Sequence, residues 1–346
     1  MELPPLQLGG IKKLTDETGM FQHTKFSTID RKEGYTTDDN ARALIAVLKH
    51  YQNYKNSDAL GLANIYSTFL LHMQREDGRF HNLLGFDRRF KDEVGSEDCI
   101  GRALWATGYA LSTEVSEPFK NAVKEIFDRG LPSSLGFTSP RAIAFTILGL
   151  SYYRSAFPED FNVNERIMSL TKRLIHLYRS VADDDWRWFE PYITYANPRL
   201  PQALLAAHVT TTDKTYLQVA RDSLDFLIKI QVIDEMFIPI GAEGWFKRSG
   251  SRALFDQQPI EASCMIEAAL DAYEVTNFEL YERTAQIAFE WYHGKNIHGV
   301  SIYNEDESTC YDGLTPFGLN RNQGAEATLS YYLAYLKLKE SGRIIS

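Results

Sequence analysis

Apolar and polar positions along the chain follow a pattern that occurs six times. Each repeat opens with a short polar cluster and continues directly into an apolar run rich in small residues. An alanine near the start of each run marks the repeat, so that neighbouring runs begin 41 to 65 residues apart, at Ala43, Ala103, Ala144, Ala203, Ala262 and Ala327. This spacing leaves room for a helix, a returning helix and a loop, and such a recurrence indicates a repeat architecture.

The pattern predicts two kinds of helix. The run AIAFTILGL, residues 142–150, is apolar on every side except at Thr146, and a helix without a polar face has to be buried all round. The segments between the runs instead predict amphipathic helices with one apolar face. In the first of them this face consists of Leu62, Tyr66, Phe69, Leu70 and Met73.

Buried helices that alternate with one-sided helices form an inner ring inside an outer ring. A short segment at residues 11–17 supplies the first outer helix, so the set closes at six pairs. An open array would leave its terminal buried helices exposed, which favours closure. We therefore predict an all-α fold, an (α/α)6 toroid with short turn loops at one mouth. Residues 1–346 should form a single domain, because the chain has no Pro/Gly/Ser-rich linker.

Composition narrows the classes of partner. The net charge of −9 and the lack of basic clusters argue against nucleic acid. Three cysteines without C-x-x-C spacing are predicted to be reduced core residues, and no motif indicates a metal or another cofactor. No apolar run reaches the ~18 residues of a membrane span, and the N-terminus lacks the pattern of a signal peptide. We expect a cytoplasmic protein without a membrane partner.

Functional residues are expected where the inner helices begin. These helices run parallel in a toroid, so their N-termini and polar clusters meet at one mouth. Residues five and one before each marker alanine lie one above the other on a single helical face. Ordinary helix capping explains any one of them, but so much buried polarity is costly without water or partners, which predicts a functional pocket. The residues concerned include Asp38, Arg42, Asp98, Arg102, Gln202, Gln257, Glu261, Asn322 and Glu326.

Aromatic loops suggest the kind of ligand. Three of the five tryptophans lie in loops that follow outer helices, at Trp186, Trp188 and Trp245, with Tyr192 nearby. Aromatic faces beside carboxylates suit sugar rings, which stack on one surface and hydrogen-bond through their hydroxyls. The alternative is that these side chains only cover the end of the barrel. Further predicted substrate contacts are Glu97, Gln258, Asn320, Arg321, Asn322 and Gln323.

Several segments together resemble a known group of proteins. They are LTDETGMFQHTKFS (14–27), GYTTDDNARAL (34–44), SEDCIGRALWATG (96–108) and YDGLTPFGLNRNQGAEATLSYYLA (311–334). The chain resembles, over nearly its whole length, the bacterial α/α-toroid domains of the six-hairpin glycosidase superfamily that often occur fused to or beside glycosyltransferases. The resemblance implies a carbohydrate-active toroid but neither a substrate nor catalytic residues. We expect the toroid to stand alone, without a glycosyltransferase domain.

Hydrolysis of a glycoside needs a carboxylate base and a carboxylic acid with separated pKa values. Asp38 and Asp98 are the predicted bases, because each sits in a first helical turn with an arginine at i+4, Arg42 and Arg102. Both surroundings favour the charged form of a carboxyl. A structural ion pair is the alternative for each. Asp39 is also a candidate, since either aspartate of the pair could be the helix cap.

Glu190, Glu261 and Glu326 are the predicted acids, because none has a cation on its own helical face. In a ring of six helices Asp98 should look across at Glu261, and Asp38 toward Glu190. Such a separation leaves room for water, which favours an inverting glycoside hydrolase acting on a small oligosaccharide, with carboxyl groups ~6.5 to 9.5 Å apart.

Other functions remain open. A sugar epimerase or isomerase on this fold would use a pair of pore histidines, and of eight histidines only His208 lies on an inner helix. A polysaccharide lyase would need a basic groove, against which the net charge argues. A non-catalytic toroid that binds a glycan or docks a glycosyltransferase is a further alternative, and the sequence does not separate hydrolysis from phosphorolysis.

Overall fold

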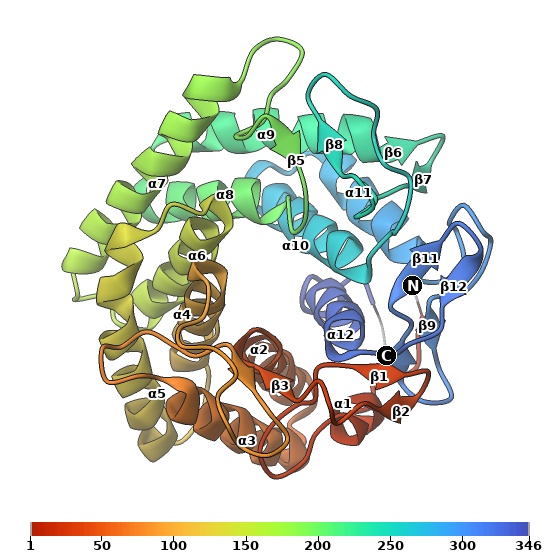
Figure 1. Ribbon diagram of the computed structural model, residues 1–346. Helices are drawn as coiled ribbons and strands as arrows, with labels where there is room; N and C mark the ends of the chain where they lie inside the picture. The colour runs from red at the N-terminus through yellow and green to blue at the C-terminus, as the bar shows by residue number, and fades with distance from the viewer. Residues whose placement is uncertain (1, 345–346) are drawn as a thin grey trace.

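The computed structural model describes residues 2–344, which form two concentric rings of helices (Figure 1). Each inner helix packs against the next, and the last packs against the first, so the ring is closed. The inner helices are α2 (Thr37–Tyr54), α4 (Glu97–Leu111), α6 (Pro140–Ala156), α8 (Arg199–Thr211), α10 (Pro259–Thr276) and α12 (Ala325–Glu340). The predicted (α/α)6 toroid is confirmed.

The outer helices are amphipathic, and each buries one stripe against the inner ring. They are α1 (Gly9–Lys13), α3 (Ser57–Met73), α5 (Glu117–Gly130), α7 (Asn162–Val181), α9 (Lys214–Gln231) and α11 (Glu279–Glu290), with a short 3-10 helix, η1 (Leu131–Gly136), after α5. The first outer helix begins two residues earlier than predicted and is only one turn long. None of the described helices is long and apolar enough to cross a membrane.

Small residues let α4 and α6 approach until their backbones touch. A Cβ atom added at Gly108 would lie 2.2 Å from the carbonyl oxygen of Gly149, and one added at Gly149 would lie 2.4 Å from that of Leu104. Any side chain at these positions would separate the two helices. The small residues of the inner runs therefore set how tightly the ring closes on this side.

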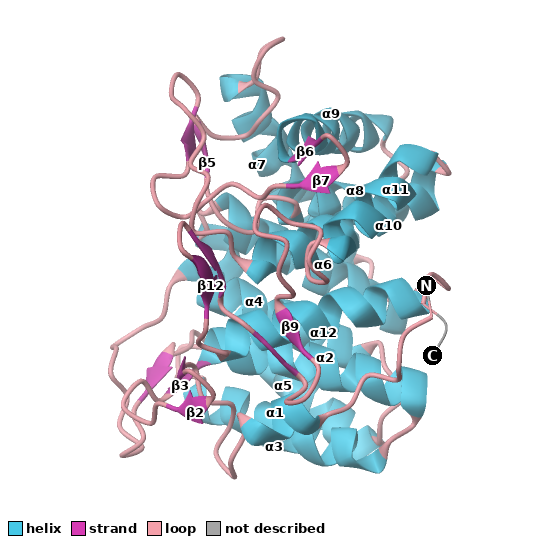
Figure 2. Cartoon of the chain, turned by 90° about the vertical axis from the view of Figure 1, so that its right-hand side faces the viewer, coloured by secondary structure: helices cyan, strands magenta, loops and turns pink. Residues whose placement is uncertain are grey.

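Short two-stranded sheets, all antiparallel, connect the helices. The strands are β1 (Thr24–Lys25), β2 (Thr28–Ile29), β3 (Tyr35–Thr36), β4 (Leu83–Leu84), β5 (Tyr192–Ile193), β6 (Val232–Ile233), β7 (Met236–Phe237), β8 (Phe246–Lys247), β9 (Tyr303–Asn304), β10 (Thr309–Cys310), β11 (Gly313–Thr315) and β12 (Gly318–Asn320). Pairs form between β1 and β2, β3 and β4, β5 and β8, β6 and β7, β9 and β10, and β11 and β12. Seen from the side, β3, β5 and β12 lie at one end of the toroid (Figure 2), which we call the mouth.

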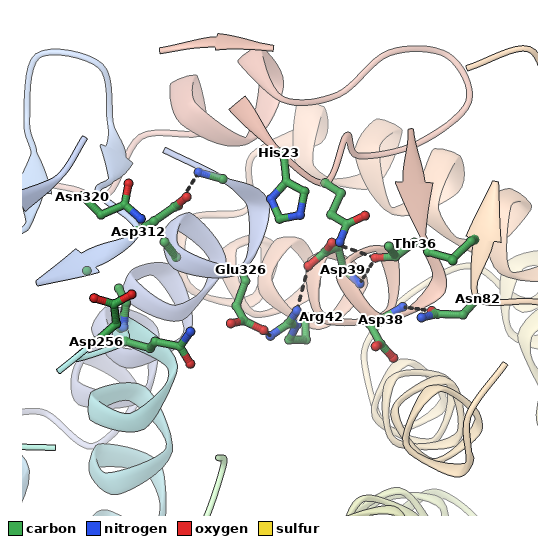
Figure 3. Close-up of a pocket in the computed structure, with 17 residues that line it drawn as sticks. His23, Thr36, Asp38, Asp39, Arg42, Asn82, Asp256, Asp312, Asn320 and Glu326 are labelled. Atoms are coloured by element: carbon green, nitrogen blue, oxygen red, sulfur yellow. Dashed lines mark hydrogen bonds and ion pairs between the residues drawn. The ribbon is translucent and has the colours of Figure 1, made fainter. Parts of the chain in front are cut away.

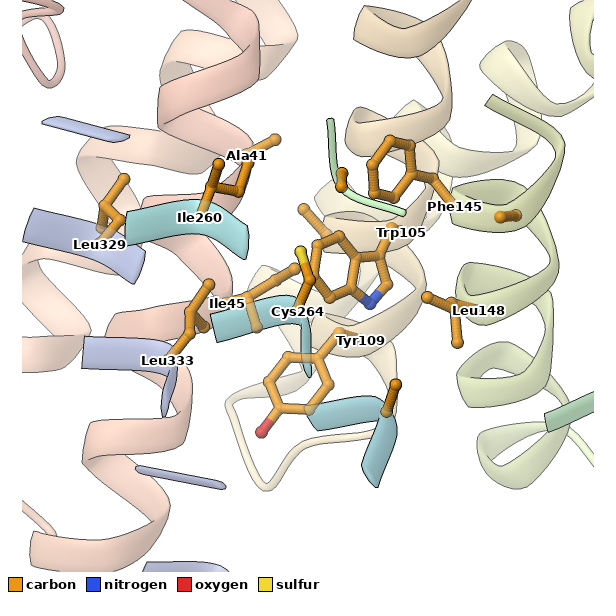
Figure 4. Close-up of a cluster of buried hydrophobic side chains, with 14 of the residues drawn as sticks. Ala41, Ile45, Trp105, Tyr109, Phe145, Leu148, Ile260, Cys264, Leu329 and Leu333 are labelled. Carbon is orange, nitrogen blue, oxygen red and sulfur yellow. The ribbon is translucent and has the colours of Figure 1, made fainter. Parts of the chain in front are cut away.

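Below the mouth the bore of the toroid is packed with side chains. Ile45, Trp105, Phe145, Cys264 and Leu333 meet there from five inner helices (Figure 4). Burying a side chain of this size contributes roughly 1.5 to 3 kcal/mol. The three cysteines are free and buried, as predicted. The bore is therefore a packed core and not an open channel.

Candidate functional site

A cavity of about 340 Å³ opens at the mouth between the N-termini of α2, α10 and α12. Five carboxylates line it, on Asp38, Asp39, Asp256, Asp312 and Glu326. Asp38 and Asp39 come from α2 and Glu326 from α12, whereas Asp256 and Asp312 come from loops (Figure 3). The basic lining side chains among the described residues are Arg42 and His23, and the neutral polar ones include Thr36, Asn82, Gln258 and Asn320.

The start of α2 fixes one wall of this cavity. Thr36 is the helix cap, because its Oγ1 accepts a hydrogen bond from the backbone N–H of Asp39 at 3.0 Å. The same hydroxyl donates to Asp39 Oδ2 at 2.7 Å, and Arg42 donates to Oδ1 at 2.7 Å. The expectation that one of the paired aspartates caps the helix is wrong. Asp39 is instead clamped between a threonine and an arginine.

Arg42 joins the first inner helix to the last. One terminal nitrogen binds Asp39 and the other donates to Glu326 at 2.7 Å. Burial alone would raise the pKa of Glu326, but the guanidinium of Arg42 outweighs it and holds this pKa below its ordinary value. The cation comes from α2 and not from the helical face of Glu326 itself, so the predicted raised pKa and acid role of Glu326 are contradicted. Its side chain stays 44% exposed, so the carboxylate can still accept a hydrogen bond in the cavity.

Asp38 also differs from its prediction. Its expected partner Arg42 is occupied elsewhere, and Arg102 Nε lies 3.8 Å from Oδ1, beyond hydrogen-bond distance. Oδ1 is buried without a hydrogen-bond partner. Burial therefore dominates over the two arginines and raises the pKa of Asp38, where the sequence predicted a carboxylate held ionised.

Asp312 is a lining residue that the sequence analysis missed. It follows β10, and its Oδ1 accepts a hydrogen bond from the backbone N–H of Gly324 at 2.7 Å. Burial raises the pKa of Asp312 to about 6, while that hydrogen bond and His23 act in the opposite direction. In the sequence, Asp312 is only the first residue of an Asp-Gly pair, which is typical of an ordinary turn. His23, Asn82 and Asp256 were likewise missed, because loop residues carry no helical period.

The opposite side of the mouth is filled by residues 194–197, which we call the mouth loop. Tyr195 Oη donates to Asp98 Oδ2 at 2.7 Å, and Ser139 Oγ donates to Oδ1 at 2.6 Å. Glu261 accepts the backbone N–H of Ala196 at 2.5 Å and the side-chain amide of Asn197 at 3.1 Å. Asp98 and Glu261 therefore both bind the mouth loop, where the sequence predicted that they face each other across an open pore.

Arg141 secures the same loop from below. It donates to the carbonyl of Tyr195 at 2.6 Å, to Asn197 Oδ1 at 3.1 Å and to Glu190 Oε2 at 2.8 Å. Glu190 was predicted to act as an acid without a cation, but Arg141 of α6 supplies one. These three contacts bind Glu190 and the mouth loop to α6.

Glu261 is almost completely buried, with 1% of the residue exposed. Burial raises its pKa to about 7, against the lowering effect of the two N–H donors of the mouth loop. The expected direction of the shift is confirmed. The side chain does not line the cavity, so its present contacts are those of a group that positions the mouth loop.

Two of the predicted stacking residues lie in the core. Trp188 is fully buried and Trp186 is 3% exposed, with its indole N–H donated to the carbonyl of Glu190. Neither presents a face to a ligand, and that prediction is wrong. Tyr192 and Trp245 line a separate, shallower depression beside the β5–β8 pair, and Tyr192 is 42% exposed.

The other predicted substrate contacts divide into two groups. Gln258 and Asn320 line the cavity. Glu97 instead accepts hydrogen bonds from the backbone N–H groups of Thr138 and Ser139, both at 2.6 Å, where α6 begins. Its contacts are those of a helix cap supplied by the neighbouring helix.

The polar run before α12 is used largely for structure. Asn322 Oδ1 accepts the backbone N–H of Phe26 at 2.9 Å, and buried Gln323 accepts a hydrogen bond from Thr309. Arg321 is exposed and does not line the cavity. These residues hold the loops on either side of the cavity in place.

No family model matches the chain, and no curated protein sequence matches it. Solved structures do. A cellobiose 2-epimerase from Bacillus thermoamylovorans is 13% identical, with 97% of this chain and 96% of that chain covered and a TM-score of 0.76. A GH76 α-mannanase from Bacteroides thetaiotaomicron is 12% identical, covering 96% and 93%, with a TM-score of 0.68.

A third similar structure is an unsaturated glucuronyl hydrolase specific for heparin, 11% identical over 97% of this chain and 95% of that chain, with a TM-score of 0.65. All three are members of the six-hairpin glycosidase superfamily, so the fold resemblance seen in the sequence is confirmed. Hydrolases and epimerases share this toroid, and at such low identity the likeness establishes the fold alone. The reaction has to be argued from the cavity.

Proposed function

We propose that this chain, a toroid with the six-hairpin glycosidase fold, hydrolyses a glycosidic bond of a small oligosaccharide in the mouth cavity. One observation carries the proposal: two carboxyl groups of the same cavity have pKa values shifted in opposite directions. That of Glu326 is lowered and that of Asp312 is raised to about 6. A general acid and a general base in one site need pKa values that their surroundings shift apart in this way.

Glu326 is the proposed base and Asp312 the proposed acid. The carboxylate of Glu326, ionised by Arg42 and open to the cavity, accepts a proton from the attacking water. The carboxyl of Asp312 donates its proton to the leaving oxygen. Asp38 is the second candidate acid, because its pKa is also raised and its Oδ1 has no hydrogen-bond partner. We propose inversion at the anomeric carbon, which NMR of the first-formed product anomer tests.

The test is a panel of α- and β-linked disaccharides, assayed with the protein and two variants. Glu326→Gln and Asp312→Asn should each lower the rate by roughly 10² to 10⁴. Asp184→Asn is the matched control, because Asp184 is fully exposed outside the cavity. Wild-type kcat/KM should fall about tenfold per pH unit above about 6, where Asp312 loses its proton. If both variants keep wild-type rates, Glu326 and Asp312 do not perform the chemistry.

A sugar epimerase or isomerase is the second candidate. His23 lines the same cavity and lies close enough to Asp312 to influence its pKa, so an imidazole is available to move a proton beside a carbonyl. NMR of free reducing sugars after incubation decides between the two, because an epimer or isomer would form without cleavage of any bond between sugars. Binding of a sugar with neither reaction would instead support a glycan-binding or glycosyltransferase-docking toroid.

A further inference from the structure

The mouth cavity carries an uneven balance of charge. Five carboxylates line it, whereas the basic lining side chains within residues 2–344 are Arg42 and His23, and no lysine is among them. The lining of this cavity of about 340 Å³ is more one-sided than the whole chain, which has 46 acidic and 37 basic residues. Whatever binds there has to satisfy an acidic wall.

The cations near the cavity are already used by its own acids. Both terminal nitrogens of Arg42 donate at 2.7 Å, one to Asp39 and the other to Glu326, and the side chain is only 6% exposed. Arg102 lies behind Asp38, 6% exposed, with its guanidinium carbon 4.3 Å from the ring centre of Phe145. Neither arginine therefore offers a pair of guanidinium N–H groups to the carboxylate or phosphate of a ligand.

The neutral part of the lining suits hydroxyl groups. The amides of Asn82, Gln258 and Asn320 offer donors and acceptors, and the carboxylates accept hydrogen bonds from sugar hydroxyls. A uronate or phosphate group would lose its hydration and meet like charges without compensation. An ammonium group would be attracted to the same wall.

We infer that the cavity selects neutral and amino sugars and excludes uronates, sugar phosphates and inorganic phosphate, so that the glycosidic bond is cleaved by water. The inference rests on the proposed function, because it names the substrate class of that same site. The C–O bond to the leaving sugar breaks, and the water oxygen bonds to the anomeric carbon. The proton of the water passes to Glu326, and the leaving oxygen takes the proton of Asp312.

Asp256 makes the selection testable without touching the proposed acid and base. It lines the cavity just before α10, and it has no part in the proposed proton transfers. Asp256→Asn removes one negative charge and keeps the shape of the side chain, whereas Asp256→Glu keeps the charge and is the matched control. If the acidic wall repels anions, Asp256→Asn should reduce the difference in affinity between the neutral sugar and the uronate, and Asp256→Glu should leave it unchanged.

The experiment measures binding by titration calorimetry at pH 8, to one methyl glycoside that the panel identifies and to its 2-amino, 6-uronate and 6-phosphate forms. The uronate and the phosphate should bind at least about 100-fold more weakly than the neutral glycoside, and the amino sugar at least as tightly. Asp256→Asn should narrow the gap between uronate and neutral sugar by roughly threefold to tenfold. Should that variant unfold, raising the salt concentration with wild-type protein should narrow the same gap, because salt screens repulsion.

The outcomes separate the two proposals. A uronate that binds within about threefold of the neutral sugar, or a cleavage that requires inorganic phosphate, overturns the selection and leaves cleavage in this cavity intact. The inferred selection is also overturned if the difference in affinity between uronate and neutral sugar responds neither to Asp256→Asn nor to salt, because the uronate would then be excluded by its size and not by its charge. If no sugar of the set binds, the proposed function fails together with the inference.

Discussion

The two halves of the mouth contain similar carboxylates in different circumstances. The half built from α4, α6 and α10 we call the closed half, and the half between α2 and α12 the open half. In the closed half, the carboxylate oxygens already accept hydrogen bonds: Asp98 from Ser139 and Tyr195, Glu190 from Arg141, and Glu261 from the mouth loop. In the half between α2 and α12, Asp38 and Asp312 keep raised pKa values and face an open cavity. A carboxylate at a helix N-terminus is therefore no sign of catalysis by itself. Whether its oxygens are already occupied decides what it can do.

The sharpest test of this difference exchanges a glutamate for glutamine in each half. Glu326→Gln should lower turnover by roughly 10² to 10⁴ with little change in melting temperature, since it removes the proposed base from the open half. Glu261→Gln should retain turnover within about tenfold but melt earlier, because its single carbonyl oxygen can accept from only one of Ala196 and Asn197, and its amide N–H would face the other donor. Steady-state rates and melting curves of the pair check this, and the reverse pattern would exchange the roles of the two halves.

The closed half should depend on Arg141 for stability. Arg141→Met removes a cation that is 4% exposed and leaves Glu190 buried and unpaired, which should cost about 3 to 5 kcal/mol of unfolding free energy. Arg187→Met, at an exposed ion pair with Asp184, should cost less than about 1 kcal/mol. Urea denaturation measures both. Equal costs would mean that Arg141 does not anchor the mouth loop.

Glu261 should make the closed half sensitive to pH. Its pKa rises from 4.5 in the unfolded chain to about 7 in the fold, so the folded protein binds this proton more tightly. The resulting contribution is complete below pH 4.5, is lost as the pH rises through about 7, and amounts to about 3 kcal/mol. Melting temperatures between pH 5 and 8 should fall for wild type and fall less for Glu261→Gln. Parallel curves for the two proteins would contradict this assignment.

The smallest expected effect belongs to the bond between Tyr195 and Asp98. Tyr195→Phe and Asp98→Asn should each cost about 0.5 to 1.5 kcal/mol of stability, and the double variant little more than either one. Turnover should stay within about fivefold, because neither side chain lines the cavity. A double-mutant cycle of unfolding free energies measures the coupling. Loss of turnover in Asp98→Asn without loss of stability would restore Asp98 as a catalytic candidate.

The sequence predicted the ring well because its information is local. The inner helices begin at 37, 97, 140, 199, 259 and 325, each two to six residues before the alanine that marks its run. The apolar period and the caps lie in the same short segments that form these helices. Nothing further along the chain is needed to place them.

The ion pairs of the mouth could not be predicted in the same way. Arg42 was assigned to Asp38, four residues away, but it binds Glu326, 284 residues away, because α12 closes the ring against α2. Glu190 finds Arg141 across a helix pair for the same reason. A side chain at a helix start chooses between its own face and a neighbouring helix, and only the packed ring decides. The burial of Trp188 was equally a property of the whole fold.

The backbone contact between Gly108 and Gly149 gives the mouth a remote adjustment. Gly108 lies ten residues along α4 from Asp98, which at 1.5 Å per residue is about 15 Å. A methyl group at Gly108 would clash with the backbone of Gly149 and push α4 away from α6. This movement would lengthen the hydrogen bonds that the hydroxyls of Ser139 and Tyr195 donate to Asp98. A change in the position of Asp98 can therefore arise at a buried residue that does not line the cavity.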